Sequence, residues 1–256
     1  MTYYQEKWLY KFELKENHWI YVPSKVERER GIILLDDLYS KWVPPLYYYH
    51  LRNGGHVAAL KAHLGNKYFA HIDIKGFFNS TGRSRITRVL KEFYQFEKAR
   101  EIAKFSTVKN LVNSTPSHVL PFGFVQSPIL ATLCLHKSFL GNTIRECFNR
   151  KDIKISIYMD DIIISSSEKE LLDEIYMELL NAVVRSHYFI NEEKKNPPSD
   201  HVVVFNIHLS HRYLKITEKR LVNLLIDYTK TKSNHVKEGI KSYVKTVNNE
   251  QYTIFK

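Results

Sequence analysis

The stretch Ile155-Ser156-Ile157-Tyr158-Met159-Asp160-Asp161-Ile162-Ile163-Ile164 decides the fold of this chain. Two adjacent carboxylates lie between runs of β-branched and aromatic residues. This pattern predicts two strands joined by a two-residue turn, with the acids at its tip. Because aspartate also favours turns for conformational reasons, a purely structural hairpin turn is the alternative interpretation.

A further acid, Asp73, argues against the purely structural interpretation. It lies in the apolar stretch from Tyr68 to Ile74, where an ionised aspartate is costly unless the strand ends there beside a cation. Two strands that end in carboxylates are suited to hold a pair of divalent ions. Such ions serve nucleotidyl transfer, because one activates the attacking oxygen and both neutralise charge on the phosphate.

Three segments together resemble the reverse transcriptase family. Tyr158-Met159-Asp160-Asp161 is similar to its YxDD element. Asp73-Ile74-Lys75-Gly76-Phe77-Phe78 is similar to the strand with the other metal-binding aspartate, and residues 120–128 are similar to its Leu-Pro-x-Gly…Ser-Pro element. They follow in the family's order, with Asp160 87 positions after Asp73. The subgroup that the chain resembles is the bacterial retron-like and defence-associated enzymes of the unknown-group and abortive-infection types.

The resemblance implies an α+β fold, that of a right-hand polymerase with fingers, a palm built on an antiparallel sheet, and a short helical thumb. Fingers and palm are expected in residues 1–210, with the palm at 68–82 and 116–210, and the thumb in residues 211–256. The implied activity is that of an RNA-directed DNA polymerase, which extends a DNA strand from deoxynucleotides. Its expected setting is bacterial antiphage defence, with a structured non-coding RNA as template and DNA as product.

The catalytic residues implied by the resemblance are Asp73, Asp160, Asp161 and Lys194. Metal binding is assigned to Asp73, Ile74, Asp160 and Asp161, with two Mg²⁺ ions, or Mn²⁺, as the cofactor. Lys194 is the expected proton donor to the leaving pyrophosphate, a role that a partly desolvated ammonium can fill. An exposed charged turn is the alternative explanation for Lys194.

The residues expected to contact the incoming nucleotide are Phe78, Phe122, Gly123, Gln126, Arg28 and Arg30. Phe78 is expected to exclude a 2′-hydroxyl, although a core position also explains its ring. Gly123 allows a close approach of the backbone. Arg28 and Arg30 lie in a stretch that we interpret as a polar turn able to reach a triphosphate, or as a merely exposed basic turn. Many family members have glutamine in place of Phe122. This departure argues against ordinary template-dependent synthesis more than against metal-dependent catalysis.

Positive charge brackets the acidic stretches. The formal net charge is +11, and residues 83–109 carry eight Lys or Arg against three acids, while residues 212–256 carry ten against four. This favours a nucleic-acid partner, with solvated helix faces as the alternative. The residues expected to bind nucleic acid are Tyr158, Met159, Arg83, Arg85, Lys241 and Lys245.

The remaining composition is that of a soluble globular protein. No apolar run reaches the roughly 18 residues of a membrane span, and with only two cysteines in the chain a reducing cytoplasm is expected. The run Tyr47-Tyr48-Tyr49 is interpreted as core or interface rather than as a base-stacking platform. A zinc site at His208 and His211 is disfavoured, since no carboxylate lies between them. A homo-oligomer or a partner protein subunit is compatible with the sequence.

Three functions remain open at this stage. The first is templated reverse transcription on a cognate RNA. The second, prompted by Phe122, is DNA synthesis with little or no template, or primed from a protein residue. The third is an inactive polymerase-like subunit that binds nucleic acid in a ribonucleoprotein. The presence of Asp73, Asp160 and Asp161 counts against the third, and all active alternatives require these acids to meet at a common point.

Overall fold

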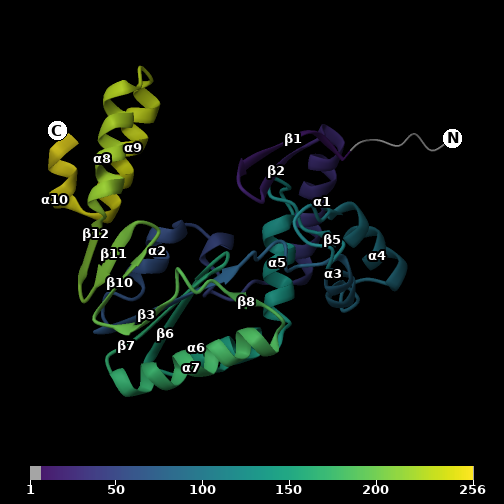
Figure 1. The fold of residues 1–256 in the computed structure, drawn as a ribbon, viewed down its shortest axis with the longest axis horizontal. Coiled ribbons are helices and arrows are strands. Elements are labelled where there is room, and N and C mark those ends of the chain that lie inside the picture. The colour runs from purple at the N-terminus through teal and green to yellow at the C-terminus, as the bar shows by residue number, and fades with distance from the viewer. Residues whose placement is uncertain (1–6, 256) are drawn as a thin grey trace. The chain divides into compact units, whose positions relative to one another are not determined.

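The computed structural model describes residues 7–255, which form two compact units (Figure 1). The first unit consists of residues 1–46, 74–143 and 181–190, and the second of residues 47–73, 144–180 and 191–256. Three elements pass from one unit into the other: the strand β3 (Tyr68–Lys75) and the helices α6 (Phe139–Phe148) and α7 (Lys169–Arg185).

The second unit is built on an antiparallel sheet. Its strands β6 (Ile153–Tyr158) and β7 (Asp161–Ser166) form the predicted hairpin, and β7 pairs with β3 along Tyr68 to Asp73. The strand β9 (Asn196–Ser199) pairs with β3 on its other side, and β8 (Phe189–Ile190) continues the sheet at Ile74 and Lys75. The isoleucines of the hairpin are at most 4% exposed, so burial on both faces explains their continuous apolar run.

A separate three-stranded sheet carries the C-terminal helices. It comprises β10 (His201–Val204), β11 (Ile207–Ser210) and β12 (Tyr213–Ile216). The sequence predicts a hairpin of residues 202–209 and 213–217, but the first segment is itself two strands, because Phe205 and Asn206 have positive φ values of 56° and 59° and form a turn there. Two consecutive residues of positive φ are typical of a tight hairpin, and asparagine accepts this conformation readily.

Helices pack on the three-stranded sheet to form one core. They are α2 (Gly55–Lys61), α8 (Glu218–Lys230) and α9 (Asn234–Val247), followed by α10 (Asn249–Tyr252) and the short helix η2 (Thr253–Phe255). Buried residues such as Leu60, Ile216, Leu224 and Val244 belong to this cluster. The sequence predicts helices over 218–230 and 236–247, and an amphipathic helix over 168–184. All three are confirmed, as α8, α9 and α7.

The first unit contains a hairpin that the sequence did not predict. This hairpin consists of β1 (Trp8–Lys15) and β2 (His18–Pro23), and α1 (Lys25–Lys41) follows it. The prediction of a polar turn at Arg28 and Arg30 is wrong, since both lie in α1. The overlooked signal is Ser24, whose hydroxyl accepts the backbone N–H of Glu27 at 3.3 Å and caps the helix, as N-cap serines do.

The rest of the first unit is largely helical. The basic region 83–109 forms two helices, α3 (Arg83–Leu90) and α4 (Phe96–Phe105), and β4 (Val108–Lys109) pairs with β5 (His118–Val119). The helix α5 (Ser127–His136) has Pro128 in its first turn, a position that proline favours. Among the described residues, no helix has the length and apolar character needed to cross a membrane.

Buried tyrosines and a buried histidine stabilise the sheet of the second unit. The short helix η1 (Tyr49–Leu51) follows Tyr47 and Tyr48, which are each 1% exposed, so their predicted core role is confirmed. His63 is fully buried, with Nδ1 2.6 Å from Ser165 Oγ and Nε2 2.8 Å from Ser156 Oγ. Because Ser156 lies on β6 and Ser165 on β7, one imidazole links both strands of the hairpin.

Burial of His63 makes the stability of the fold depend on pH. It lowers the pKa of His63 from 6.5 to about 3, with the charge of Lys154 acting in the same direction. Below pH 6.5 the unfolded chain therefore takes up a proton that the folded chain refuses. We predict that the free energy of unfolding falls with decreasing pH by about 1.4 kcal/mol per pH unit on account of this residue.

Chemical denaturation between pH 7 and pH 4.5 measures this slope in the wild-type protein and in His63→Gln. The variant is expected to be less stable at every pH, but its stability depends less steeply on pH. Equal slopes in the two proteins would mean that His63 is already protonated in the folded state.

Candidate active site

Strand register gathers the three aspartates of the second unit at one end of its sheet. Asp73 on β3 is directly opposite Asp161, the first residue of β7. Asp161 also pairs with Tyr158 across the hairpin, which leaves Met159 and Asp160 as the two-residue turn. The expectation that these acids meet is therefore supported by the pairing itself.

Two of the carboxylates have cationic or hydrogen-bonding partners. Asp73 is 2% exposed, and its Oδ2 lies 3.0 Å from Nζ of Lys194. Asp161 Oδ1 lies 2.7 Å from Nε2 of His71, which is itself buried. The backbone N–H of Asn191 donates to the Asp73 carbonyl at 2.9 Å, so the turn that carries Lys194 is anchored to β3.

Sequence reasoning missed His71. It stands two residues before Asp73, and alternate residues of a strand share a face, so a polar residue at this position was the available signal. Its other ring nitrogen, Nδ1, lies 3.1 Å from the Lys194 carbonyl oxygen. His71 thus connects Asp161 with the turn that positions Lys194.

The carboxyl of Asp160 ionises less readily than a free aspartate. Burial raises its pKa to about 6, and the charges of Asp161 and Asp73 add to the effect. Repulsion from both neighbours means that the three acids interact electrostatically. A cluster of this kind attracts a cation, because a divalent ion would relieve the repulsion that raises the pKa.

The turn at Met159 is strained and held by a second overlooked residue. Met159 has a φ of 59°, a conformation that is uncommon for a residue with a side chain. Its N–H donates to Nδ1 of His50 at 2.9 Å. Burial lowers the pKa of His50 to about 4, although a hydrogen bond to the Ile157 backbone acts in the opposite direction. His50 is therefore neutral at pH 7, and its unprotonated Nδ1 can accept from the turn.

Tyr158, predicted to contact nucleic acid, lies in an aromatic cluster of the second unit. Its ring packs edge-on against His50, His56 and Phe205, at centroid distances of 5.9, 5.8 and 5.4 Å. It also lines an open hollow together with Phe205 of the β10–β11 turn and Tyr243 of α9. Of the predicted lysines on α9, Lys241 pairs with Glu238 at 3.2 Å, and Lys245 lies 5.6 Å from the Tyr252 ring centroid.

The donor set fits a hard divalent cation. Asp73, Asp160 and Asp161 offer carboxylate oxygens, which Mg²⁺ and Mn²⁺ prefer. In the part of the chain that the structure describes, no three His, Cys, Asp or Glu side chains are arranged as a ready-made metal site. Asp73 instead pairs with Lys194, and Asp161 pairs with His71. The side chain of Ile74 is buried, so any part of this residue in metal binding is limited to its backbone.

The predicted nucleotide-binding rings belong to the first unit, where they pack on one another. The Phe78 and Phe122 centroids are 4.7 Å apart, and His18 covers Phe122 at 4.0 Å. Phe122 also accepts a hydrogen bond at its carbonyl oxygen from the Tyr21 N–H at 2.9 Å. The loop with the Leu-Pro-x-Gly element is therefore joined to β2.

The same contact explains Gly123. This residue has a φ of 103°, and a Cβ there would lie 2.1 Å from the Tyr21 carbonyl oxygen. The close approach that demands glycine is thus made by the chain's own β2 strand. Gln126 is 1% exposed, and its Nε2 lies 3.5 Å from Ser106 Oγ. In this structure it is a core residue and does not face solvent.

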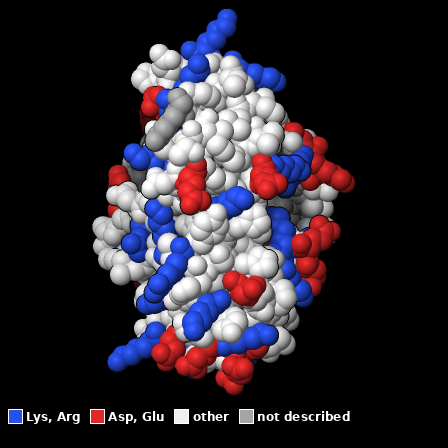
Figure 2. Space-filling view, turned by 90° about the vertical axis from the view of Figure 1, so that its left-hand side faces the viewer, with Lys and Arg blue, Asp and Glu red and all other residues white. Residues whose placement is uncertain are grey.

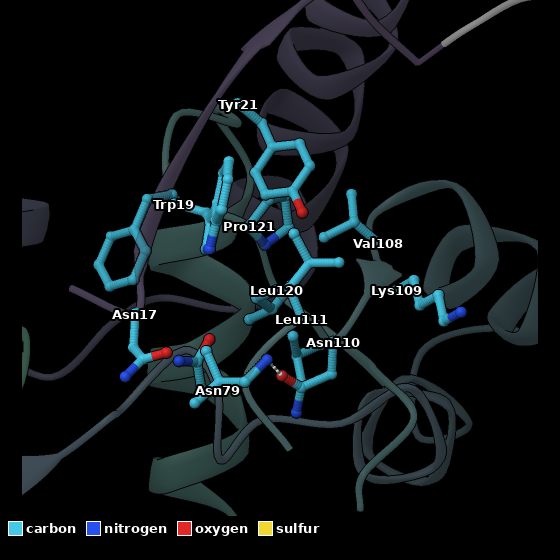
Figure 3. A pocket seen from close by; sticks show the side chains of 13 residues that line it. Asn17, Trp19, Tyr21, Asn79, Val108, Lys109, Asn110, Leu111, Leu120 and Pro121 are labelled. Atoms are coloured by element: carbon cyan, nitrogen blue, oxygen red, sulfur yellow. Dashed lines mark hydrogen bonds between the residues drawn. The ribbon is translucent and has the colours of Figure 1, made fainter. Parts of the chain in front are cut away.

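A small hollow lies beside this loop and is shown in Figure 3. Trp19 and Tyr21 of β2 face Asn79, Asn110 and Leu111 across it, with Leu120 and Pro121 on its floor. The Asn110 side chain accepts the Val112 N–H at 3.0 Å, so it already has a partner. The cavity volume is about 20 Å³, little more than one water molecule occupies, which excludes a nucleobase.

The four arginines named from the sequence are all in the first unit. Arg30 is engaged, with Glu101 at 3.5 Å, Glu27 at 3.8 Å and the Phe105 ring centroid at 4.4 Å. Arg28 is exposed on α1. Arg83 and Arg85 are partly buried near the start of α3. Because Arg30 pairs with Glu27 of α1 and with Glu101 of α4, it would have to exchange partners to reach a phosphate.

An antiparallel sheet with one aspartate on a central strand and two at an adjoining hairpin defines the palm of a right-hand polymerase. The fold class predicted from the sequence, α+β of this type, is thereby confirmed. The profile of the family described as reverse transcriptase (RNA-dependent DNA polymerase) matches residues 30–201. Since this is well over half of the 256 residues, the chain belongs to the reverse transcriptase family.

One solved structure agrees with the chain at the level of the fold. The chain is similar to the foamy viral protease-reverse transcriptase dRH in complex with double-stranded DNA, with 16% identity and a TM-score of 0.50. The match covers 91% of this chain and 35% of the viral one, so this chain spans about a third of that protein. A telomerase from Candida tropicalis matches with 15% identity and a TM-score of 0.44, over 76% of this chain and 40% of that one. No curated protein matches the chain.

The raised pKa of Asp160 generates a prediction about metal binding. At pH 7 this carboxyl is mostly ionised, but below its pKa of about 6 a cation has to displace a proton. We predict that the affinity for Mn²⁺ falls about tenfold between pH 7 and pH 5. The free Mn²⁺ concentration, measured by electron paramagnetic resonance, gives the affinity. The same affinity at both pH values would contradict the prediction.

Proposed function

We propose that this protein is an RNA-directed DNA polymerase that extends a DNA strand from deoxynucleotides. The observation that carries the proposal is the register of the sheet, in which Asp73 lies opposite Asp161 with Asp160 in the adjoining turn. Membership of the reverse transcriptase family supports it independently. The fingers and palm are proposed to occupy residues 1–210 and the thumb residues 211–256.

The three aspartates are proposed to hold two Mg²⁺ ions. When bound, these ions would lower the cost of forming the attacking 3′-oxygen and would neutralise charge on the α-phosphate. By resemblance to the family, Asp73 and Asp160 are proposed as the main ligands and Asp161 as the weaker one. Mn²⁺ suits the same oxygen donors.

Lys194 is proposed to protonate the leaving pyrophosphate. Burial acts to lower its pKa, but the hydrogen bond and the charge of Asp73 outweigh this and raise the pKa. Lys194 is therefore protonated at neutral pH. Its side chain is 60% exposed, so exchange from Asp73 to a phosphate oxygen requires only side-chain rotation.

The nucleotide and its template are assigned by resemblance. Phe78 is proposed to exclude the 2′-hydroxyl of a ribonucleotide, and Phe122 replaces the polar side chain that many relatives place beside it. The retron-like resemblance supports a cognate structured RNA as template and a role in bacterial antiphage defence. Sequencing the nucleic acid that copurifies with the protein tests the template directly.

One observation favours a second candidate function. Phe122 is packed between Phe78 and His18, so the usual polar contact is replaced by an apolar stack. The second candidate is therefore DNA synthesis with little or no template, or primed by a protein residue, at the same acids. Incorporation of labelled deoxynucleotides with and without added RNA separates the two functions.

Neutralising one catalytic acid provides the central test. We predict that Asp160→Asn lowers deoxynucleotide incorporation at least a hundredfold, because the ions lose a carboxylate. Thermal unfolding should stay at or above the wild-type temperature, since the substitution removes like-charge repulsion. The matched control is Asp152→Asn, which changes an exposed acid in the loop before β6. Retained incorporation by Asp160→Asn would refute the proposed function.

The role of Phe78 has its own test. We predict that Phe78→Val raises incorporation of ribonucleotides relative to deoxynucleotides by about tenfold or more, because the smaller side chain leaves room for a 2′-hydroxyl. The ratio is informative even though the variant loses about 1–3 kcal/mol of stability from the cavity it leaves. Phe77→Val, at the neighbouring buried ring, is the control. An unchanged ratio in Phe78→Val would remove Phe78 from the nucleotide site.

A further inference from the structure

Two open hollows meet along α3 in the first unit. One has a volume of about 730 Å³ and is lined by Arg83, Arg85 and Arg88, together with His118 and His187. The other, of about 400 Å³, is lined by Arg83, Arg88, Lys91, Phe96 and Arg100. Arg83, Ser84 and Arg88 line both hollows, so the two are direct neighbours. We call the two hollows together the α3 groove.

The α3 groove carries positive charge without acidic compensation. No Asp or Glu lines either hollow. Within residues 7–255 its arginines and Lys91 form no ion pair. On the face in Figure 2, by contrast, basic and acidic side chains are interspersed. Burial lowers the pKa of His118, and the charge of Arg83 lowers it further, as expected where positive charges crowd together.

The arginines of the groove differ in how firmly they are held. Arg83 Nε donates to Thr107 Oγ1 at 3.0 Å, and Arg85 Nη2 donates to the Ser186 carbonyl at 2.7 Å. Arg85 also lies 4.4 Å from the Tyr188 ring centroid. Arg88 and Arg100 are exposed. The groove therefore combines two partly buried, hydrogen-bonded arginines with two exposed ones, and several charges along one groove suit a polyanion longer than one phosphate.

Phe96 adds an aromatic platform. It is 49% exposed at the start of α4, and Lys91 Nζ lies 5.9 Å from its ring centroid. An exposed ring among cations matches the way single-stranded nucleic acid is bound, with phosphates on basic side chains and bases on aromatic faces. A duplex would keep its bases stacked inside and leave such a ring unused.

We propose that the α3 groove binds a single-stranded segment of nucleic acid, with the arginines and Lys91 at its phosphates and Phe96 against a base. This proposal deepens the proposed function and rests on it for the presence of a nucleic-acid partner. Every residue that lines the groove belongs to the first unit, whereas the three aspartates belong to the second. The groove is thus a binding site in addition to the acid cluster.

The test measures binding of a fluorescent 20-nucleotide oligouridylate over a range of salt concentrations, with Asp160→Asn as the parent protein so that no synthesis takes place. The triple variant Arg88→Gln, Lys91→Gln, Arg100→Gln should weaken binding at least tenfold at low salt. Its negative slope of log affinity against log salt should become shallower by about 2, since each of the three lost phosphate contacts on a single strand contributes about 0.7. Phe96→Ala should weaken binding about fivefold with an unchanged slope.

The control triple variant is Arg150→Gln, Lys151→Gln, Lys169→Gln, which removes the same charge from exposed positions outside the groove. A groove triple variant that binds like this control overturns the proposal. Oligothymidylate of equal length shows whether RNA or DNA is the preferred strand. If inorganic phosphate, at the same total phosphate concentration, displaces the oligonucleotide, the groove is a small-anion site and the strand proposal is wrong.

The outcome is separable from that of the proposed function. A wild-type protein that makes no DNA, together with weakened binding in the groove triple variant, would refute the polymerase and keep the groove. Normal DNA synthesis by the wild type, with unchanged binding in the groove triple variant, would do the reverse.

Discussion

Mutual repulsion among Asp73, Asp160 and Asp161 is the constraint on which the second unit depends. The sheet holds these carboxylates close enough for the pKa of Asp160 to rise to about 6. The charge of Lys194 offsets part of the repulsion at Asp160, and hydrogen bonds tie the turn that carries Lys194 to β3. His71, which contacts Asp161, lies on β3 itself. A looser sheet would let the acids separate. His63, buried between Ser156 and Ser165, and His50, which accepts from the Met159 N–H, are therefore part of the same arrangement.

The first unit contributes apolar packing where its relatives are expected to place polar contacts. Phe122 lies between Phe78 and His18, and Gln126 is buried beside Ser106. The segment that the sequence assigns to nucleotide recognition is thus mostly occupied by the protein itself. If this segment contacts the nucleotide as proposed, selection there would rest on shape more than on hydrogen bonds.

Sequence reasoning found the parts of the fold that are set by local patterns. The acidic turn, the strand with Asp73 and the three helices α7, α8 and α9 all follow from runs and periodicities that a single sequence displays. The β1–β2 hairpin was overlooked although residues 10–15 alternate apolar and charged side chains; most of β1 is exposed, so the strand contributes no buried face to the core. The break at Phe205 and Asn206 was hidden by apolar residues on both sides. Roles for His71 and His50 depend on contacts across 90 and 109 positions, which one sequence does not reveal.

The fit of Gly123 against Tyr21 bears on how the first unit can move. The carbonyl of Tyr21 occupies the space that a side chain at position 123 would need, and the Tyr21 amide bonds the neighbouring Phe122. Strand β2 and the 120–124 loop are therefore joined by a hydrogen bond at Phe122 and packed closely at Gly123. Any rearrangement of that loop on ligand entry therefore requires the β1–β2 hairpin to move as well, and we expect the two segments to move together.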